Sequence, residues 1–161
     1  MRRQRSLHLG FVLSLLLALL LQLIALPDWL SPARPYWLPM VLSYWALSEA
    51  RVSSLVGAFI AGLAADVVFG TVLGQHALPL VVVAYLVSRL RGVFVLFEVW
   101  QAMLVLVPIW ALYTFILFWI DGLTDRQASQ ELRWMPIIPT TLLWHFVYGL
   151  MVRWFKPRRD D

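Results

Sequence analysis

The chain has 161 residues, of which 61% are hydrophobic and only 14% are charged, whereas soluble domains carry about 25% charged residues. This composition excludes an ordinary soluble domain and indicates an integral membrane protein. The sequence contains no cysteine, which excludes disulfides, thiol catalysis and thiolate metal sites. The net charge of +4 does not indicate nucleic-acid binding, because the basic residues lie in short clusters at the ends of apolar segments.

Six apolar segments follow one another, and each is predicted to be a membrane-spanning helix. The first, residues 7–26, is long enough to cross about 30 Å of hydrocarbon and too long for the core of a secretory signal. It ends at Pro27, and a proline-rich turn leads into the second. We therefore expect an all-α polytopic membrane protein whose single transmembrane domain covers residues 1–161. Its predicted spans are residues 7–26, 36–48, 52–69, 71–88, 99–120 and 135–155.

The boundary between the third and fourth spans can be interpreted in two ways. The apolar run after His76 covers residues 77–87, which is too short to cross a membrane alone. Either the third helix ends near Phe69 and the fourth begins near Thr71, or residues 70–76 form irregular backbone buried within the protein. We favour the first interpretation.

Positive charges predict the orientation of these helices. With both termini in the cytoplasm, ten of the 13 Lys and Arg residues lie on the inner side, as the positive-inside rule requires. Seven tryptophans then fall in the belts where membrane and water meet. The outer belt contains Trp29, Trp37, Trp119 and Trp134, and the inner belt contains Trp45, Trp100 and Trp154.

The third predicted span carries one carboxylate, Asp66, among small residues. If residues 57–74 are helical, two adjoining rows of small residues form one face of the helix. Such a face allows another helix to approach closely, either from within the protein or from a partner. Asp66 is expected to point into the protein, where it either organises the structure or couples protons or substrate. One row is Gly57, Ala61 and Ala65, and the other is Gly62, Asp66, Gly70 and Gly74.

Few residues in the sequence are candidates for catalysis, metal binding or ligand binding. His145 shares a helical face with Thr141 and Tyr148, where it would hydrogen-bond to a neighbouring helix. His76 and Asp66 complete the set of candidates, and their spacing with His145 does not resemble a metal motif such as HExxH. The sequence also contains no nucleophile motif such as GxSxG. We therefore expect no catalytic residue, no metal and no cofactor.

Two passages together resemble the family of rod shape-determining proteins called MreD. They are residues 34–45, RPYWLPMVLSYW, and residues 62–74, GLAADVVFGTVLG. The resemblance implies a non-enzymatic component of the bacterial inner membrane that acts in the elongation machinery. Its implied partners are MreC, the actin-like MreB, RodA and the elongation penicillin-binding protein, which together direct lateral peptidoglycan synthesis. The family is also similar in architecture to the membrane substrate-binding components of vitamin transporters.

These observations give two functional hypotheses. In the first, the chain is a scaffold whose glycine face on residues 57–74, together with Arg34, Pro35 and Trp37, holds neighbouring helices and receives the transmembrane helix of MreC. In the alternative, the chain is a transporter component in which Asp66, with His145, lines a ligand cavity. A small pair on the first helix, Ser14 and Ala18, would then dock a coupling partner. In either case the basic residues on the inner side, Arg89, Arg91 and residues 153–159, would contact anionic membrane lipid, which we favour, or a cytoplasmic partner.

Overall fold

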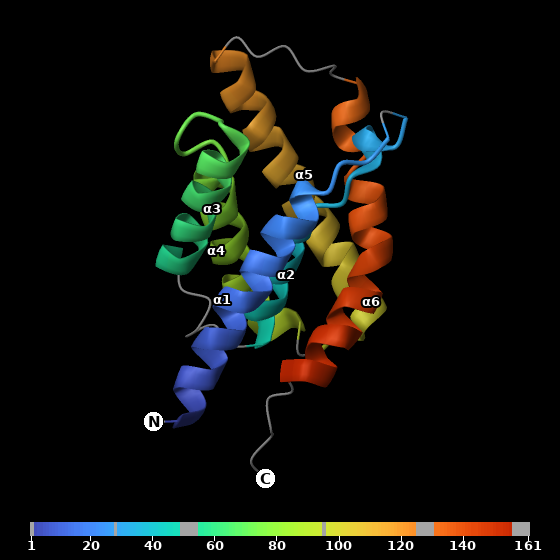
Figure 1. Cartoon of the computed structure of the whole chain (residues 1–161). Coiled ribbons are helices and arrows are strands. Elements are labelled where there is room, and N and C mark those ends of the chain that lie inside the picture. Colours follow the sequence, from blue (N-terminus) through green and yellow to red (C-terminus); the bar gives the residue numbers. More distant parts are fainter. Residues whose placement is uncertain (1, 28, 49–54, 95, 125–130, 156–161) are drawn as a thin grey trace.

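The computed structural model describes the chain except for residues 1, 28, 49–54, 95, 125–130 and 156–161. The described residues form six α-helices and two short 3-10 helices, and no strand occurs among them (Figure 1). The prediction of an all-α protein is therefore confirmed. The helices are α1 (Arg2–Leu23), η1 (Ser31–Ala33), α2 (Trp37–Ser48), α3 (Leu55–Phe69), α4 (Ala77–Phe94), α5 (Val99–Leu123), η2 (Glu131–Trp134) and α6 (Ile137–Phe155).

Successive helices run in opposite directions along one bundle (Figure 1). We call the end where α1 begins and α6 ends the terminal end. The opposite end, which carries η1, η2 and the turn between α3 and α4, is the distal end. Every second connection therefore lies at the distal end, where segments far apart in the sequence come together.

The short helix α2 is the centre of the bundle. Its 12 residues span about 18 Å at 1.5 Å per residue, and residues 38–46 are all buried. Helices α1, α4 and α6 pack around it. The mostly apolar sequence of α2 suits this position, because the neighbouring helices cover residues 38–46 on every side.

Trp45 of α2 lies in this core, and its predicted place in the inner tryptophan belt is wrong. Its side chain is 1% exposed, and its Nε1 donates a hydrogen bond of 2.8 Å to Ser14 Oγ. Because the indole N–H finds this partner, the ring can leave the membrane surface. Ser14 and Ala18 are buried as well, so they do not form a surface for a coupling partner.

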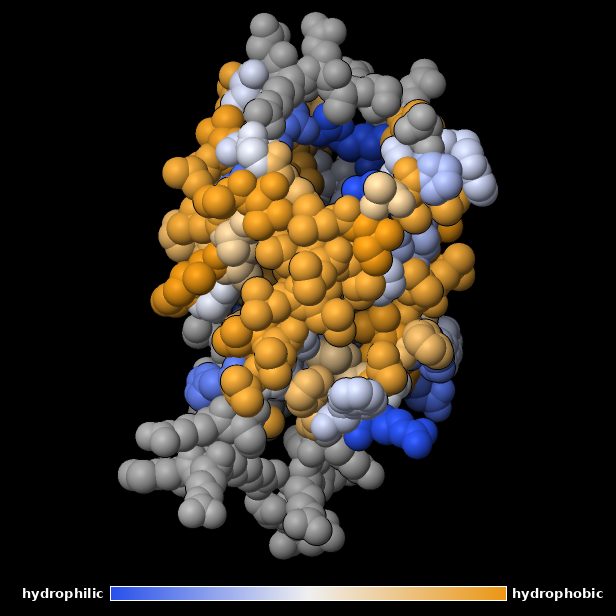
Figure 2. Space-filling model, viewed as in Figure 1, coloured by the Kyte–Doolittle hydropathy of each residue, from blue (hydrophilic) through white to orange (hydrophobic). Residues whose placement is uncertain are grey.

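The middle of the face seen in Figure 2 is apolar, with hydrophilic residues toward the two ends. On α6, for example, Ile138, Leu142 and Phe146 are 64–70% exposed and follow one another at helical spacing. An apolar surface of this extent is costly in water, and it matches a hydrocarbon surround.

Three helical segments are long and apolar enough to cross a membrane: Ala77–Phe94, Val99–Leu123 and Leu132–Phe155. The segments Leu7–Leu23 and Leu55–Phe69 are apolar but shorter. The crossing of all six helices stays a prediction.

The fourth helix begins at Ala77, so its predicted start near Thr71 is wrong. Residues 70–76 form an irregular turn, but Gly70, Val72 and Leu73 in it are exposed, so the alternative of irregular backbone buried within the protein is not met either. The predicted end of the third helix near Phe69 is confirmed. Gly70 and Gly74 have φ angles of +61° and +101°, in the left-handed region that glycine tolerates best. They therefore do not continue the small-residue row of α3, and the helical face predicted over residues 57–74 ends at Phe69.

Candidate functional site

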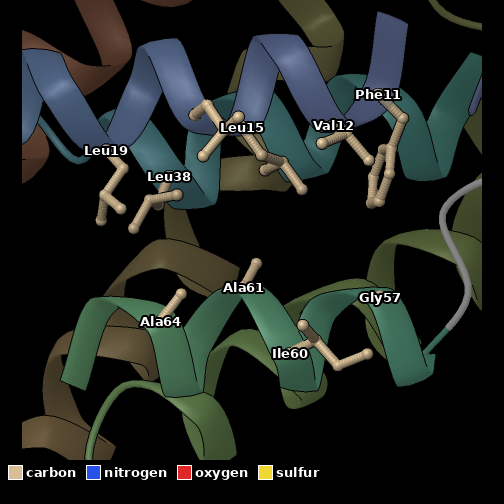
Figure 3. A pocket seen from close by; sticks show the side chains of 10 residues that line it. Phe11, Val12, Leu15, Leu19, Leu38, Gly57, Ile60, Ala61 and Ala64 are labelled. Carbon is tan, nitrogen blue, oxygen red and sulfur yellow. The ribbon is translucent and has the colours of Figure 1, made fainter. Parts of the chain in front are cut away.

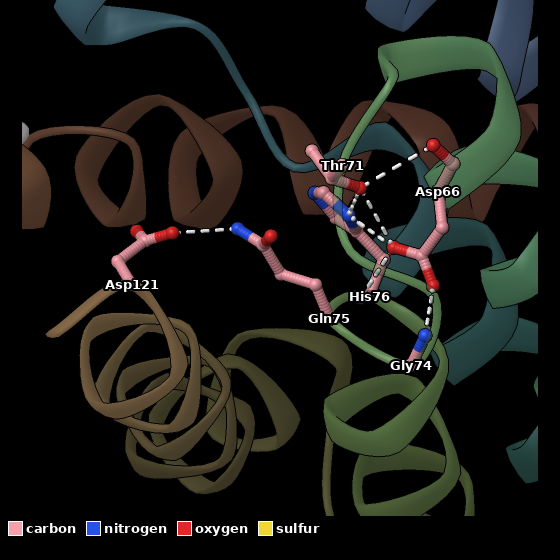
Figure 4. A network of polar contacts seen from close by, with 6 residues as sticks. All are labelled: Asp66, Thr71, Gly74, Gln75, His76 and Asp121. Carbon is pink, nitrogen blue, oxygen red and sulfur yellow. Dashed lines mark hydrogen bonds and ion pairs between the residues drawn. The ribbon is translucent and has the colours of Figure 1, made fainter. Parts of the chain in front are cut away.

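Asp66 holds the turn between α3 and α4 in place (Figure 4). Its side chain is fully buried. The carboxylate Oδ1 accepts hydrogen bonds from the Thr71 hydroxyl at 3.0 Å and from the His76 backbone amide at 2.7 Å. The other oxygen, Oδ2, accepts from the Gly74 amide at 2.8 Å. Asp66 therefore replaces the helical hydrogen bonds that α3 and α4 lack where their chains reverse.

The imidazole of His76 completes the surroundings of this carboxylate. Its Nδ1 lies 2.8 Å from Asp66 Oδ1, so Nδ1 carries the proton that is shared between the two side chains. The carboxylate thus has four donors, all supplied by residues within ten positions along the chain. A carboxylate surrounded in this way serves to order the turn and has little capacity left for a ligand.

The positive φ angle of Gly74 in this turn leads to a first testable prediction. Replacing Gly74 with alanine forces an L side chain to adopt a φ of +101°, which we expect to lower the free energy of unfolding by about 1–3 kcal/mol. The matched control is Gly149→Ala in α6, where a Cβ meets open space and alanine favours the helix. Thermal unfolding in detergent, followed by tryptophan fluorescence, should show a lower midpoint for Gly74→Ala only. Equal midpoints for both variants would contradict the role of this backbone conformation.

The small residues of α3 form two rows with different neighbours. Gly62 lies against the first residue of α4, where an added Cβ would lie 2.2 Å from the Cα of Ala77. Ala58 and Ala65 occupy the same side of α3 and are fully buried. This row brings α3 and α4 into backbone contact, and it includes Ala65, which the sequence analysis assigned to the other row.

The second row of α3 faces an apolar cavity between α3 and α1 (Figure 3). The cavity has a volume of about 240 Å³. It exists because α1 packs mainly on α2, and α3 packs mainly on α4. Leu38 of α2 forms part of its lining. The small row on α3 comprises Gly57, Ala61 and Ala64, with Ile60 beside it, and the opposite wall on α1 comprises Phe11, Val12, Leu15, Leu16 and Leu19. We call this cavity the α1/α3 groove.

The predicted site residues Arg34, Pro35 and Trp37 lie in the turn that joins α1 to α2 at the distal end. One guanidinium nitrogen of Arg34 donates to the backbone oxygen of Gln22 at 3.2 Å. The backbone amide of Trp37 donates to the side-chain oxygen of Gln22 at 3.2 Å. Both contacts fix the end of α1 relative to the start of α2, and none of these residues lines the α1/α3 groove.

Tyr36, between these residues, ties the turn to the other half of the bundle. Its backbone amide donates to Thr140 Oγ1 of α6 at 2.9 Å, and its hydroxyl lies 3.0 Å from Thr114 Oγ1 of α5. Sequence reasoning did not select Thr114, Thr140 or Gln22 as site residues. The available signal was that each is an isolated polar residue in an apolar helix, where it needs a partner.

A second polar chain joins the α3–α4 turn to α5. The Gln75 amide nitrogen donates to Asp121 Oδ1 at 2.6 Å (Figure 4). Asp121 Oδ2 pairs with Arg133 of η2. Sequence reasoning did not select Asp121 or Arg133 as site residues. Both are largely buried in the structure because they satisfy each other's charge.

The structure does not bring Asp66 and His145 together around a cavity. His145 is exposed on α6, whereas Asp66 is buried against the α3–α4 turn and does not line the α1/α3 groove. Within the described part of the chain, no group of three or more His, Asp or Glu side chains could hold a metal ion. The transporter hypothesis therefore has no polar ligand site in these residues.

The fold and this arrangement define an all-helical membrane protein whose polar side chains are used to tie its own helices together. The family of the rod shape-determining protein MreD matches residues 1–154, so the chain belongs to that family. It is 29% identical over 139 residues to a rod shape-determining protein MreD of Haemophilus influenzae, which covers 84% of this chain and 83% of the relative. No solved structure matches the chain. Family membership assigns the chain a role in determining rod shape.

Proposed function

We propose that the chain is a non-enzymatic scaffold of the bacterial inner membrane that binds MreC within the elongation machinery. In this role it crosses the membrane several times with both termini in the cytoplasm. It helps to direct lateral peptidoglycan synthesis together with MreB, RodA and the elongation penicillin-binding protein. The observation that carries the proposal is the α1/α3 groove, whose α3 wall combines the small residues Gly57, Ala61 and Ala64 with Ile60.

A transmembrane helix is the occupant that this groove fits best. Association of helices in lipid depends on close packing, and small residues at helical spacing allow two backbones to approach. The side chains of the α1 wall are large and apolar, so they would pack around a partner helix on the other side. The cavity itself is smaller than a helix of about 10 Å diameter, so only the side chains along one face of the partner would enter it.

Arg34, Pro35 and Trp37 contribute to this function indirectly. Their contacts with Gln22 hold the distal ends of α1 and α2 together, and α1 is the helix that forms one wall of the groove. The absence of enzymatic activity is supported by the surroundings of Asp66, whose carboxylate is occupied by donors from its own turn.

The proposal that MreC binds in the α1/α3 groove leads to a second testable prediction. Replacing Ala61 with leucine fills part of the groove without touching the α3–α4 contact, so the protein should insert and fold while its complex with MreC weakens about tenfold or more. The measurement is the amount of MreC that co-purifies with the tagged protein from solubilised membranes. Undiminished co-purification with the leucine variant would exclude the groove as the MreC site.

Val67→Phe is the matched control for this experiment. Val67 lies on the same helix, is 70% exposed and does not line the groove, so the larger side chain extends toward lipid. We expect this variant to retain MreC. Loss of MreC from both variants would show that any added bulk on α3 disturbs the complex, and it would contradict the proposed site.

A further inference from the structure

His145 is a polar side chain on the outer surface of α6. It lies near the midpoint of this 19-residue helix, about 12 Å along the axis from Ile137, and α6 belongs to a segment that is long and apolar enough to cross a membrane. The side chain is exposed, and its imidazole makes no hydrogen bond or ion pair with any residue that the structure describes. Hydrocarbon offers no hydrogen-bond partner, so a polar group at this depth is costly unless another protein surface meets it.

The polar neighbours of His145 on α6 do not supply that partner. Tyr148 turns its ring into the core, where the ring centroid lies 5.6 Å from that of Trp144. The hydroxyl of Thr141 donates to the backbone oxygen of Ile137 at 2.7 Å. The hydrogen bond to a neighbouring helix that the sequence predicts for His145 is therefore not made among the described residues, and a second chain has to supply it.

The surface around His145 is suited to close contact with a second helix. Gly149 lies one turn beyond His145, is exposed, and has open space where a Cβ would be. At 3.6 residues per turn, Ile138, Leu142, His145 and Gly149 lie within about 60° of one another around the helix axis. Phe146 borders them and is 70% exposed. We call these five residues the α6 face: Ile138, Leu142, His145, Phe146 and Gly149.

We propose that the α6 face binds the α6 face of a second copy of this chain, so that two copies form a symmetric dimer in the membrane. A neutral imidazole has one N–H donor and one acceptor nitrogen, so two His145 side chains satisfy each other. Two copies inserted in the same orientation are related by a two-fold axis along the membrane normal. This axis makes the two α6 helices parallel and brings residues of equal depth together, which places His145 against its own copy.

The composition of the α6 face favours a second copy over a helix of opposite charge. None of its five residues carries a permanent charge, so the face does not need a charged partner. Near the crossing point, Gly149 of one copy meets Gly149 of the other, and the missing side chains let the backbones approach while the larger neighbours pack around them. Arg153 lies one turn further, toward the terminal end, where water and lipid headgroups screen the like charges of the two copies.

The dimer leaves the α1/α3 groove open. Helix α6 packs on α5 and α2, and it lies on the side of the bundle opposite α3 (Figure 1). Each copy in the dimer therefore keeps its own groove for a partner helix. The inference does not rest on the proposed binding of MreC, and either can fail without the other.

Cross-linking in membranes tests the contact directly, because the chain contains no cysteine and a single introduced thiol reports only contacts between copies. Leu142→Cys places a thiol on the α6 face one turn from His145. Under mild oxidation with copper phenanthroline we expect a disulfide-linked species of twice the mass of the 18.6 kDa chain. Tyr85→Cys is the matched control, since Tyr85 is 48% exposed on α4 and lies outside the α6 face. It should link much less under the same conditions.

Substitutions in the Leu142→Cys protein then separate the hydrogen bond from simple proximity. Leucine at an exposed position suits lipid and should leave the unfolding midpoint in detergent unchanged. We expect His145→Leu, which removes the hydrogen bond, and Gly149→Leu, which blocks close approach, each to lower the linked fraction at least about threefold. His145→Gln keeps a donor and an acceptor and should retain most of the linkage. Tyr85→Leu should have no effect.

Several results would overturn the dimer. Leu142→Cys would then link no more than Tyr85→Cys, or His145→Leu would link as well as the parent, or His145→Gln would lose as much linkage as His145→Leu. A further contrary result is that His145→Leu releases co-purifying MreC while the linkage persists. That result would assign the α6 face to the transmembrane helix of MreC in place of a second copy.

Discussion

Replacing Asp66 with asparagine is expected to lower the free energy of unfolding by about 3 kcal/mol or more. The carboxylate accepts four hydrogen bonds, two of them from the backbone amides of Gly74 and His76. Asparagine retains one acceptor oxygen, but an NH₂ group takes the place of the other. Two donors, this NH₂ group and the Gly74 amide, would then face each other without an acceptor. Each buried donor left without an acceptor costs about 1–3 kcal/mol, so the loss of one or two of them accounts for the expected effect.

The measurement is unfolding in detergent followed by tryptophan fluorescence, with Thr71→Val as a graded comparison. Valine removes only the hydroxyl that donates to Asp66 at 3.0 Å, so its effect should be about 1 kcal/mol. If Asp66→Asn were as stable as the parent protein, the carboxylate would not be the element that orders the turn.

The same variant separates the two roles considered for Asp66. If asparagine restores rod shape in cells that lack the native protein, at a temperature where the variant is folded, proton coupling through Asp66 is excluded. Loss of shape under those conditions, with the fold intact, would instead favour a direct functional role. The hydrogen bonds from within the α3–α4 turn lead us to expect restored shape.

The fold was predictable from the sequence where hydrophobicity alone determines it. Six apolar segments with proline or charged residues between them predicted six helices, and α2 and α5 begin within one residue of the predicted positions. The start of α4 was not predictable in this way. Residues 70–76 include apolar side chains such as Val72 and Leu73, and their irregular backbone depends on Asp66, whose partners are set by the folded turn. Trp45 was misplaced for a similar reason, because its partner Ser14 lies on another helix.

The candidate site was only partly accessible to sequence reasoning. The small residues of α3 were recognisable by their spacing, but their division into two rows depends on where α1 and α4 pack. The distal polar contacts were missed because Gln75, Asp121 and Arg133 belong to three different segments. Their positions in the sequence do not indicate that they meet, whereas the structure buries them against one another.

Replacing Gly62 with alanine is expected to destabilise the protein although alanine is the better helix former. An alanine gains about 1 kcal/mol over glycine within a helix. At this position, however, its Cβ would lie 2.2 Å from the Cα and 2.6 Å from the backbone nitrogen of Ala77. Backbone atoms cannot rotate away as a side chain can, so α3 and α4 must separate. The cost of such overpacking, about 1–3 kcal/mol and more where the backbone must move, exceeds the gain in helix propensity.

Whether Gly62→Ala lowers or raises the stability of the protein therefore tests the α3–α4 contact. Gly92→Ala in α4 is the matched control, because a Cβ there meets open space and the substitution should stabilise the helix or leave it unchanged. We expect Gly62→Ala to lower the unfolding midpoint in detergent while Gly92→Ala does not. A Gly62→Ala protein with a raised midpoint would show that the two helices are farther apart than this contact requires. Because α3 also forms one wall of the α1/α3 groove, its displacement should weaken MreC co-purification as well. We expect this weakening only in a variant whose stability is also lowered.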